Sequence, residues 1–214
     1  MKVQLALDFG TIDESKAILE EVSDYIDIVE IGAISTEYGF RALEELKKAY
    51  PDPEYLSDIK IADGGSYFAE MAHNYGADYV TVLGVVDNAT IESALQASRE
   101  TGIKVVADML GVRNFMERVK ELDAMGVEYL SVHTPADLQA LNHTPFEHLR
   151  IASQLVKNAK LSVAGGIGPQ NIDQVLPYRP EIIISGSSLT SAPNKRENAK
   201  KMREIINAYE EAHK

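Results

Sequence analysis

The stretch at residues 58–65, with the sequence DIKIADGG, carries two carboxylates and a lysine where a buried strand is expected to end. Side chains alternate along a strand, so Asp58 and Lys60 point to one face and Ile59 points to the other. Asp63 lies beyond the strand end, beside two glycines that let the backbone turn or approach a ligand closely. Charges at the end of a buried strand need either a partner or a chemical role. This stretch is therefore the first candidate for an active site.

Further ionisable side chains stand at or near the ends of other short apolar runs, and these are Asp8, Glu30, Asp108 and His133. Each has an ordinary structural explanation. Asp8 could cap a helix, Glu30 and Asp108 could pair with Lys60, and a lone histidine is often hydrogen-bonded filler. Taken together they are harder to explain as packing, because several buried charges are costly unless they are paired or bind a metal.

These residue types favour metal-assisted chemistry on a developing anion. Glu30 and Asp58 come from neighbouring strands, and two carboxylates suit a hard cation such as Mg²⁺, with water and substrate oxygens as the other ligands. Mn²⁺ fits the same ligands. Lys60 could stabilise an oxyanion, and the flanking carboxylates would keep it protonated. His133 is the side chain best suited to moving a proton near neutral pH.

Short apolar runs alternate with segments of helical spacing along the whole chain. The expected strands are 5–7, 28–31, a third that ends in the stretch at 58–65, 79–83, 105–109, 129–132, 161–164 and 182–184. Such alternation indicates a parallel sheet with right-handed crossovers. Eight units favour a single-domain (β/α)8 TIM barrel over residues 1–214, with an open doubly wound sheet as the alternative. In a TIM barrel the active site lies at the C-terminal ends of the strands, where the ionisable residues occur.

Glycines follow the last two expected strands. Gly165 and Gly166 come after the seventh strand, and Gly186 and Ser187 come after the eighth. Barrels of this type often bind phosphate through backbone amides at these two strands, helped by a short extra helix, for which residues 187–192 are a candidate. The alternative is two ordinary glycine turns that lead into helices.

Two local signals predict where helices begin. Thr11 and Glu14 have the spacing of a capping box, which predicts a helix after the first strand. Pro169 predicts the first position of a helix after the seventh strand.

The composition argues against several classes of protein. The 33 acidic and 21 basic residues give a net charge of −12, which opposes binding to nucleic acid or to an anionic membrane. The chain has no cysteine, which excludes disulfides, thiolate metal sites and a cysteine nucleophile. The apolar runs are short and interrupted, so neither a signal peptide nor a membrane span is expected. We therefore expect a cytoplasmic protein.

The motifs resemble those of the orotidine 5′-phosphate decarboxylase suprafamily, whose hallmark D-x-K-x-x-D is matched by Asp58, Lys60 and Asp63. Within that suprafamily, nearly the whole chain is similar to the 3-hexulose-6-phosphate synthase family. The segments that carry the similarity are QLALD (4–8), VEIG (29–32), DIKIADGG (58–65), VTVLGV (80–85), VADM (106–109), VHT (132–134), AGGI (164–167) and the region of Gly186.

This resemblance implies a lyase, a metal-dependent aldolase that joins formaldehyde reversibly to D-ribulose 5-phosphate. The product would be D-arabino-3-hexulose 6-phosphate, formed through a 1,2-enediolate. The resemblance assigns Mg²⁺, or Mn²⁺, to Glu30 and Asp58. It makes Lys60 the group that stabilises the enediolate and His133 the leading candidate for proton transfer at C1.

The resemblance also implies roles for the remaining candidates. Asp8 would hold sugar hydroxyls, Asp108 would organise Lys60, and the glycine amides would hold the phosphate. In the suprafamily the residue that corresponds to Asp63 enters the active site of the neighbouring subunit. The resemblance therefore implies an obligate homodimer with shared active sites.

Two alternatives stay open at this point. 3-Keto-L-gulonate-6-phosphate decarboxylase shares the magnesium site and the enediolate, but it typically has glutamate where this chain has Asp108 and arginine shortly after the histidine of strand six. Residues 134–136 contain no arginine, so these differences favour the synthase. The chain also departs from many synthases at Ala33 and Pro135. The other alternative is a barrel that binds a phosphosugar without turnover, which would not need this cluster of charges.

Overall fold

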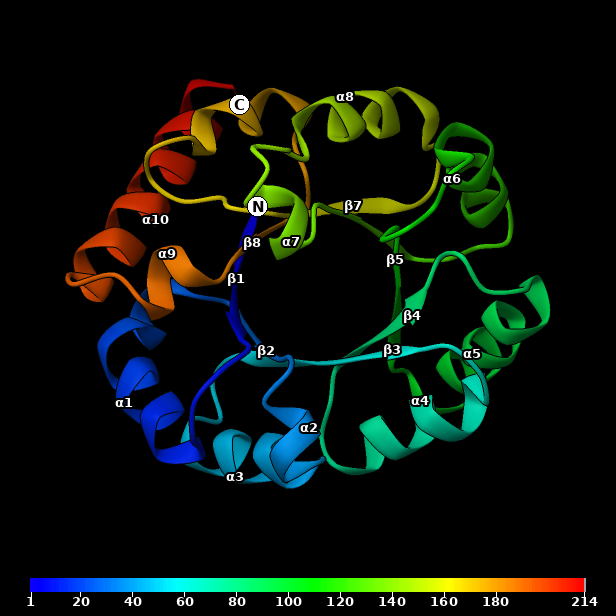
Figure 1. Cartoon of the computed structure of the whole chain (residues 1–214), viewed down its shortest axis with the longest axis horizontal. Helices are drawn as coiled ribbons and strands as arrows, with labels where there is room; N and C mark the ends of the chain where they lie inside the picture. Colours follow the sequence, from blue (N-terminus) through cyan, green and yellow to red (C-terminus); the bar gives the residue numbers. More distant parts are fainter. Residues whose placement is uncertain (214) are drawn as a thin grey trace.

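The computed structural model describes residues 1–213 and is a closed barrel of parallel strands surrounded by helices (Figure 1). The strands are β1 (Lys2–Leu7), β2 (Ile28–Ile31), β3 (Glu54–Ile61), β4 (Tyr79–Leu83), β5 (Lys104–Asp108), β6 (Tyr129–His133), β7 (Lys160–Ala164) and β8 (Ile182–Ser185). Each strand pairs with the next, and β8 returns to β1 with Val3 opposite Ile183. This closing pair confirms the TIM barrel and excludes the open sheet. Residue 214 of the expected domain lies outside the described residues.

Helices surround the barrel, most of them on its outside. They are α1 (Ile12–Val22), α2 (Ser35–Tyr38), α3 (Arg41–Ala49), α4 (Gly65–Asn74), α5 (Asn88–Thr101), α6 (Phe115–Ala124), α7 (Ala136–Gln139), α8 (Phe146–Leu155), α9 (Ser187–Thr190) and α10 (Lys195–Ala212), with the 3₁₀ helices η1 (Ser23–Tyr25), η2 (Ile172–Gln174) and η3 (Leu176–Tyr178). α1 begins with the predicted capping box of Thr11 and Glu14. Within residues 1–213, no helix is both long and apolar enough to cross a membrane.

The connection after β7 differs from the sequence prediction. Pro169 predicts a helix here, but the segment forms only the short 3₁₀ helices η2 and η3. Pro177 lies inside η3, and a proline in the interior of an α-helix removes one hydrogen bond and clashes with the preceding turn. Pro177 therefore prevents a regular α-helix from continuing along the segment that begins at Pro169.

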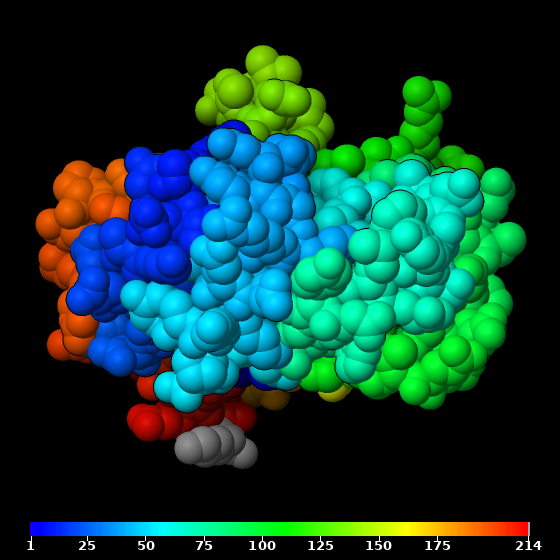
Figure 2. Space-filling view, turned by 90° about the horizontal axis from the view of Figure 1, so that it is seen from below, coloured from blue at the N-terminus to red at the C-terminus, as the bar shows by residue number. Residues whose placement is uncertain are grey.

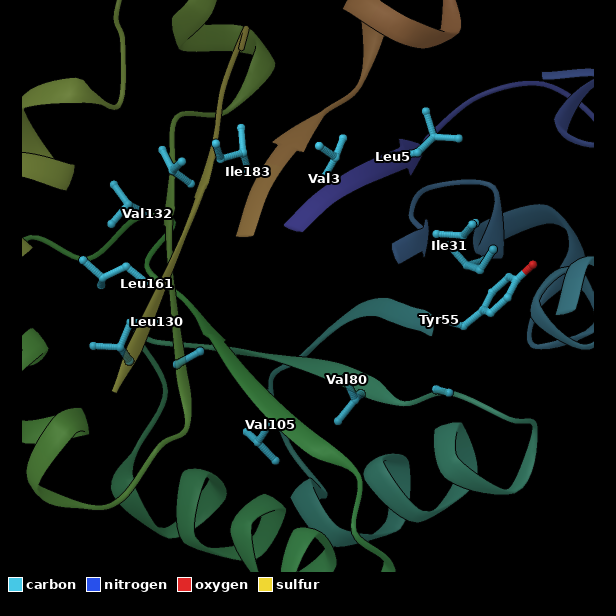
Figure 3. Close-up of a cluster of buried hydrophobic side chains, with 14 of the residues drawn as sticks. Val3, Leu5, Ile31, Tyr55, Val80, Val105, Leu130, Val132, Leu161 and Ile183 are labelled. Carbon is cyan, nitrogen blue, oxygen red and sulfur yellow. The ribbon is translucent and has the colours of Figure 1, made fainter. Parts of the chain in front are cut away.

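Apolar side chains form two cores, one on each side of the strands. Outward-facing residues such as Val80, Val105 and Leu130 pack between the barrel and its helices (Figure 3). The barrel interior has a smaller cluster made by Ile28, Leu56, Tyr79, Val106, Tyr129 and Ile182, against which Ile184 packs. This inner cluster fills the N-terminal half of the barrel interior, so the barrel is packed and is not an open pore.

Below the inner cluster, at the N-terminal end of the barrel, a layer of charges closes the bottom. Glu54 forms ion pairs with Lys2 and with Lys104, the latter at 2.9 Å, and accepts a hydrogen bond of 3.0 Å from the Tyr79 hydroxyl. Burial raises the pKa of the Glu54 carboxyl, but the bonds from Lys2, Lys104 and Tyr79 outweigh burial and lower its pKa to about 2. These residues come from β1, β3, β4 and β5, so one carboxylate ties half of the barrel together.

We predict that Glu54→Gln lowers the free energy of unfolding by about 1–2 kcal/mol, because it leaves Lys2 and Lys104 without a counter-charge. The loss stays below that of a fully buried pair, since these side chains are about one-third exposed. Urea titration followed by circular dichroism measures it. Glu128→Gln is the matched control: Glu128 lies 3.9 Å from Lys160 on the surface, and its loss should cost less than about 0.5 kcal/mol. Equal losses in both variants would contradict the role of the layer.

The same carboxylate predicts a pH dependence. The folded pKa of Glu54, about 2, lies below the value near 4.3 of an unfolded glutamate. Its contribution to stability is therefore fully present above about pH 4.3 and is lost as the pH falls towards 2. The difference in unfolding free energy between the wild type and Glu54→Gln should shrink over this window. A difference that stays constant down to pH 2 would show that the glutamate charge is not responsible.

Candidate active site

A cavity of about 790 Å³ lies at the C-terminal ends of the strands. The predicted site residues that line it are Asp8, Glu30, Asp58, Lys60, Asp108, His133, Gly165, Gly166, Gly186 and Ser187. Asp63 is the predicted residue that the structure does not bring to this cavity. It is exposed in the turn before α4, where its carboxylate accepts a hydrogen bond of 2.8 Å from the amide of Gly64.

A chain of charged groups crosses the cavity from β3 to β6. The Lys60 ammonium lies 2.5 Å from Asp58 Oδ2 and 3.4 Å from Asp108 Oδ2, and the same Asp108 oxygen lies 3.0 Å from His133 Nδ1. Burial lowers the pKa of Lys60, but the carboxylates of Asp58 and Asp108 outweigh burial and hold that pKa well above its usual range. Burial raises the pKa of Asp108, but His133 and Lys60 outweigh it and leave that pKa below its usual value. The site therefore holds a protonated lysine between the carboxylates of Asp58 and Asp108.

The backbone at Lys60 is distorted in a way that aims this side chain. Lys60 has φ +46°, and the pairing of β3 with β4 shifts register between Ser57 and Ile61. Thr81 on β4 stabilises this irregularity: its hydroxyl accepts a bond of 2.9 Å from the Lys60 amide and donates one of 2.7 Å to Asp58 Oδ1. Bulges next to active sites commonly re-aim a side chain. One threonine thus fixes both members of the Asp58–Lys60 pair.

Glu30 is a buried carboxylate, 8% exposed, that lies beside this row of charged groups. Burial, followed by the negative charges of Asp58 and Asp8, raises the pKa of Glu30 well above its usual value. Its Oε2 accepts a hydrogen bond of 2.5 Å from the carboxamide of Gln4, which is also buried. Glu30 and Asp58 thus present oxygens in a region with surplus negative charge, which is a donor set that suits a hard divalent cation.

Asp8 at the end of β1 is held by the turn after β2. The amide of Ala33 donates a hydrogen bond of 3.4 Å to Asp8 Oδ1. A Cβ atom at Gly32 would lie 2.2 Å from the same oxygen. Only glycine therefore fits at position 32 while Asp8 keeps this orientation, which points its carboxylate towards the cavity.

The glycine-rich ends of β7 and β8 form the opposite side of the cavity. Gly165 has φ +128°, and a Cβ atom there would lie 2.8 Å from Thr134 Cβ, so a side chain is excluded. Gly186 precedes α9, which is the short extra helix that the sequence predicts here. The first turn of a helix leaves amide N–H groups without intrahelical acceptors. This side can therefore offer backbone amides to an anion.

Sequence reasoning missed several polar residues that line the cavity, namely Gln4, Thr81, Ser131, Ser162 and Gln139. Alternation could have found the first four, because each lies an even number of residues before a predicted site residue or strand end. Gln139 had no such signal. It belongs to α7, which lies within the ring of strands in Figure 1 and stands out above the surface as the yellow-green segment in Figure 2.

Comparisons with known proteins agree on one family. Residues 1–202 match the profile of the Orotidine 5'-phosphate decarboxylase / HUMPS family. The chain is 42% identical over 207 residues to 3-hexulose-6-phosphate synthase of Bacillus subtilis (strain 168), covering 96% of this chain and 99% of that protein. The resemblance drawn from the motifs is therefore confirmed.

Comparison with solved structures also identifies a 3-hexulose-6-phosphate synthase as a similar protein. The crystal structure of 3-hexulose-6-phosphate synthase from Salmonella typhimurium matches with a TM-score of 0.96 at 37% identity, covering 98% of this chain and 100% of that one. 3-Keto-L-gulonate-6-phosphate decarboxylase from Vibrio cholerae matches with a TM-score of 0.85 at 27% identity, covering 97% of this chain and 98% of that one. The chain is thus more similar to this synthase than to this decarboxylase, in sequence and in backbone.

We predict that Thr81→Val lowers the free energy of unfolding by about 2 kcal/mol, since it removes a hydrogen bond to a charged group and the acceptor of the Lys60 amide. Thr81→Ser is the control that keeps the hydroxyl and deletes one methyl group, and it should lose about 1 kcal/mol or less. Chemical denaturation of the two variants measures both values. If valine is tolerated as well as serine, the hydroxyl does not hold the bulge.

Proposed function

The chain belongs to the Orotidine 5'-phosphate decarboxylase / HUMPS family as a lyase of the 3-hexulose-6-phosphate synthase type, and we propose that it joins formaldehyde to D-ribulose 5-phosphate. The product would be D-arabino-3-hexulose 6-phosphate, and the reaction would be reversible. The observation that carries this proposal is the position of Lys60 between Asp58 and Asp108, with His133 on the same aspartate. This group can stabilise an enediolate and move a proton, which is what aldol addition at C1 of a ketose requires.

Glu30 and Asp58 are the residues that would hold a divalent cation. Within residues 1–213 no group of three or more His, Cys, Asp or Glu side chains is placed to bind a metal, so water and substrate oxygens would supply the remaining ligands, as is usual for Mg²⁺. The burial of Glu30 beside the carboxylates of Asp58 and Asp8, which raises its pKa, supports a cation at this point. A bound Mg²⁺ or Mn²⁺ would polarise the substrate carbonyl and favour loss of the C1 proton.

Two residues have separate roles in the proposed reaction: His133 transfers the proton and Lys60 stabilises the negative charge. Asp108 occupies Nδ1 of His133, which leaves Nε2 for the substrate. His133 removes a proton from C1 of ribulose 5-phosphate, and the 1,2-enediolate that results is stabilised by the Lys60 ammonium. C1 then attacks the carbon of formaldehyde, a new C–C bond forms, and the aldehyde oxygen takes up a proton to become the new hydroxyl. The C2 carbonyl of the pentulose is restored as C3 of the hexulose.

The phosphate would lie at the other side of the cavity. Gly165, Gly166, Gly186 and Ser187 line this side of the cavity, and β7 and β8 carry no carboxylate, so backbone amides there would bind the phosphate. Asp8, at the end of β1 between the two sides, would accept hydrogen bonds from sugar hydroxyls.

We further propose a homodimer in which Asp63 completes the active site of the partner subunit. Asp63 does not line its own cavity, and the neighbouring aromatic residues Tyr67 and Phe68 at the start of α4 are 62% and 40% exposed. Exposed aromatic side chains of this size commonly mark interfaces between proteins. A partner that covers α4 would explain both the aromatic residues and the aspartate.

The direct test is the loss of ribulose 5-phosphate with and without formaldehyde, magnesium and a chelator. We expect turnover only when both formaldehyde and the metal are present. Decarboxylation of 3-keto-L-gulonate 6-phosphate without any formaldehyde-dependent activity would identify the decarboxylase instead. No turnover of either substrate would favour a barrel that only binds the phosphosugar.

Lys60→Ala should lower kcat by about 10²–10³-fold, because it removes the group that stabilises the enediolate. Binding of the substrate, measured by calorimetry, should persist because the phosphate is held elsewhere. Lys160→Ala is the matched control, since Lys160 lies at the opposite end of the barrel, and it should keep wild-type activity. Full activity of Lys60→Ala would remove this lysine from the mechanism.

The shared site can be tested by mixing two inactive variants, Lys60→Ala and Asp63→Ala. In a mixed dimer the subunit with intact Lys60 receives intact Asp63 from its partner, so one site in two is complete. Random re-association should then restore about one quarter of wild-type activity, as expected for a two-fold symmetric dimer. Activity that stays at the level of the separate variants would place Asp63 in its own subunit's site or outside catalysis.

A further inference from the structure

The floor of the cavity contains two buried polar atoms without a protein partner. Among the described residues 1–213, Gln4 Oε1 and Ser162 Oγ are fully buried and form no hydrogen bond. Both side chains are 1% exposed, and both line the cavity. The great majority of buried polar groups in proteins are satisfied, so two unsatisfied atoms in residues that line one cavity need an explanation.

The two atoms belong to the same part of the barrel wall. Gln4 is on β1 and Ser162 is on β7, and both strands pair with β8. Their partners in that strand are Ile184 and Ile182, which also line the cavity. The amide oxygen offers an acceptor and the hydroxyl offers a donor, so the pair matches a group that can donate and accept hydrogen bonds.

The other end of the Gln4 carboxamide is bonded to Glu30. Gln4 Nε2 donates to Glu30 Oε2 at 2.5 Å, and both residues are more than nine-tenths buried. A carboxamide is planar, so the direction of its N–H group is fixed once its oxygen is fixed. The orientation of the Glu30 carboxylate is therefore linked through Gln4 to whatever binds at the floor.

We propose that Gln4 is a positioning residue for Glu30, and that one hydroxyl-bearing group, a water molecule or a hydroxyl of the substrate, binds between Gln4 Oε1 and Ser162 Oγ to lock it. This inference rests on the proposed role of Glu30 as a metal ligand. Outer hydrogen bonds of this kind orient a ligating carboxylate before the cation arrives. The floor of the cavity thus prepares the metal site at its wall.

The test uses Mn²⁺ binding to the substrate-free protein, measured by electron paramagnetic resonance. Gln4→Met keeps the volume of the side chain and removes both hydrogen bonds, and it should weaken Mn²⁺ binding by about tenfold or more. Ser162→Ala acts only through the bound group and should weaken it by a smaller factor, about threefold. Ser15→Ala is the matched control: Ser15 Oγ is likewise buried without a partner, but it lies in α1 and does not line the cavity. It should leave Mn²⁺ binding unchanged.

A crystal structure of the metal-free protein tests the floor independently of any metal or activity. Electron density for one oxygen within hydrogen-bonding distance of both Gln4 Oε1 and Ser162 Oγ supports the proposal with water as the group. Density that is present only in a substrate complex, and belongs to a sugar hydroxyl, supports it with the substrate as the group. No density in either structure would overturn it, as would wild-type Mn²⁺ affinity in a folded Gln4→Met variant.

The readouts separate this inference from the proposed function. If the wild type binds Mn²⁺ but does not add formaldehyde, the reaction assignment is wrong and the positioning role still stands or falls by the two variants. If Gln4→Met does not fold, Ser162→Ala and the electron density decide the question. Wild-type Mn²⁺ affinity in Ser162→Ala, with no bound oxygen at the floor, would then overturn the proposal.

Discussion

The excess of negative charge at the mouth of the barrel is the constraint on which the rest of the site depends. One cavity is lined by four carboxylates, those of Asp8, Glu30, Asp58 and Asp108. Lys60 lines it too and forms ion pairs with Asp58 and Asp108. Placing like charges close together in a partly buried site is costly, and specific hydrogen-bond donors offset part of this cost. The donors are in place: Gln4 for Glu30, Thr81 for Asp58, the amide of Leu110 for Asp108 and the amide of Ala33 for Asp8. The local structure around the mouth is largely a set of such restraints.

The barrel separates stability from chemistry along its axis. The layer around Glu54 closes the N-terminal end, the apolar cluster that includes Ile28 and Val106 fills the space above it, and the polar floor with Gln4 and Ser162 lies beneath the charged mouth. The lower layers are satisfied by the protein itself. The upper layers keep unpaired atoms and surplus charge, which a packed core would not tolerate. This contrast makes the upper half of the barrel the candidate ligand-binding part.

The fold and most of the site follow from short-range patterns in the sequence. Apolar runs and the two-residue alternation locate the strands and place Asp58 with Lys60, and strand ends carry Asp8, Asp108 and His133 into one cavity. What the sequence does not reveal depends on contacts between distant strands. The bulge at Lys60 needs the hydroxyl of Thr81 on the next strand, and the link from Gln4 to Glu30 exists only once β1 and β2 are paired. The helix expected at Pro169 fails for a local reason, the nearby Pro177.

Electrostatics also sets the direction in which a phosphosugar can lie under the proposed function. Glu30 and Asp58, on β2 and β3, would repel a phosphate, whereas the glycine turns after β7 and β8 offer amide groups on the other side of the cavity. The phosphate end is therefore driven to one wall and the oxygens of the reacting end to the other, where a cation can join them to the carboxylates. Asp108 and His133, on β5 and β6, lie between these walls along the barrel. Under the proposed function, this charge pattern would select one orientation of the substrate, with its reacting end towards Glu30, Asp58 and His133.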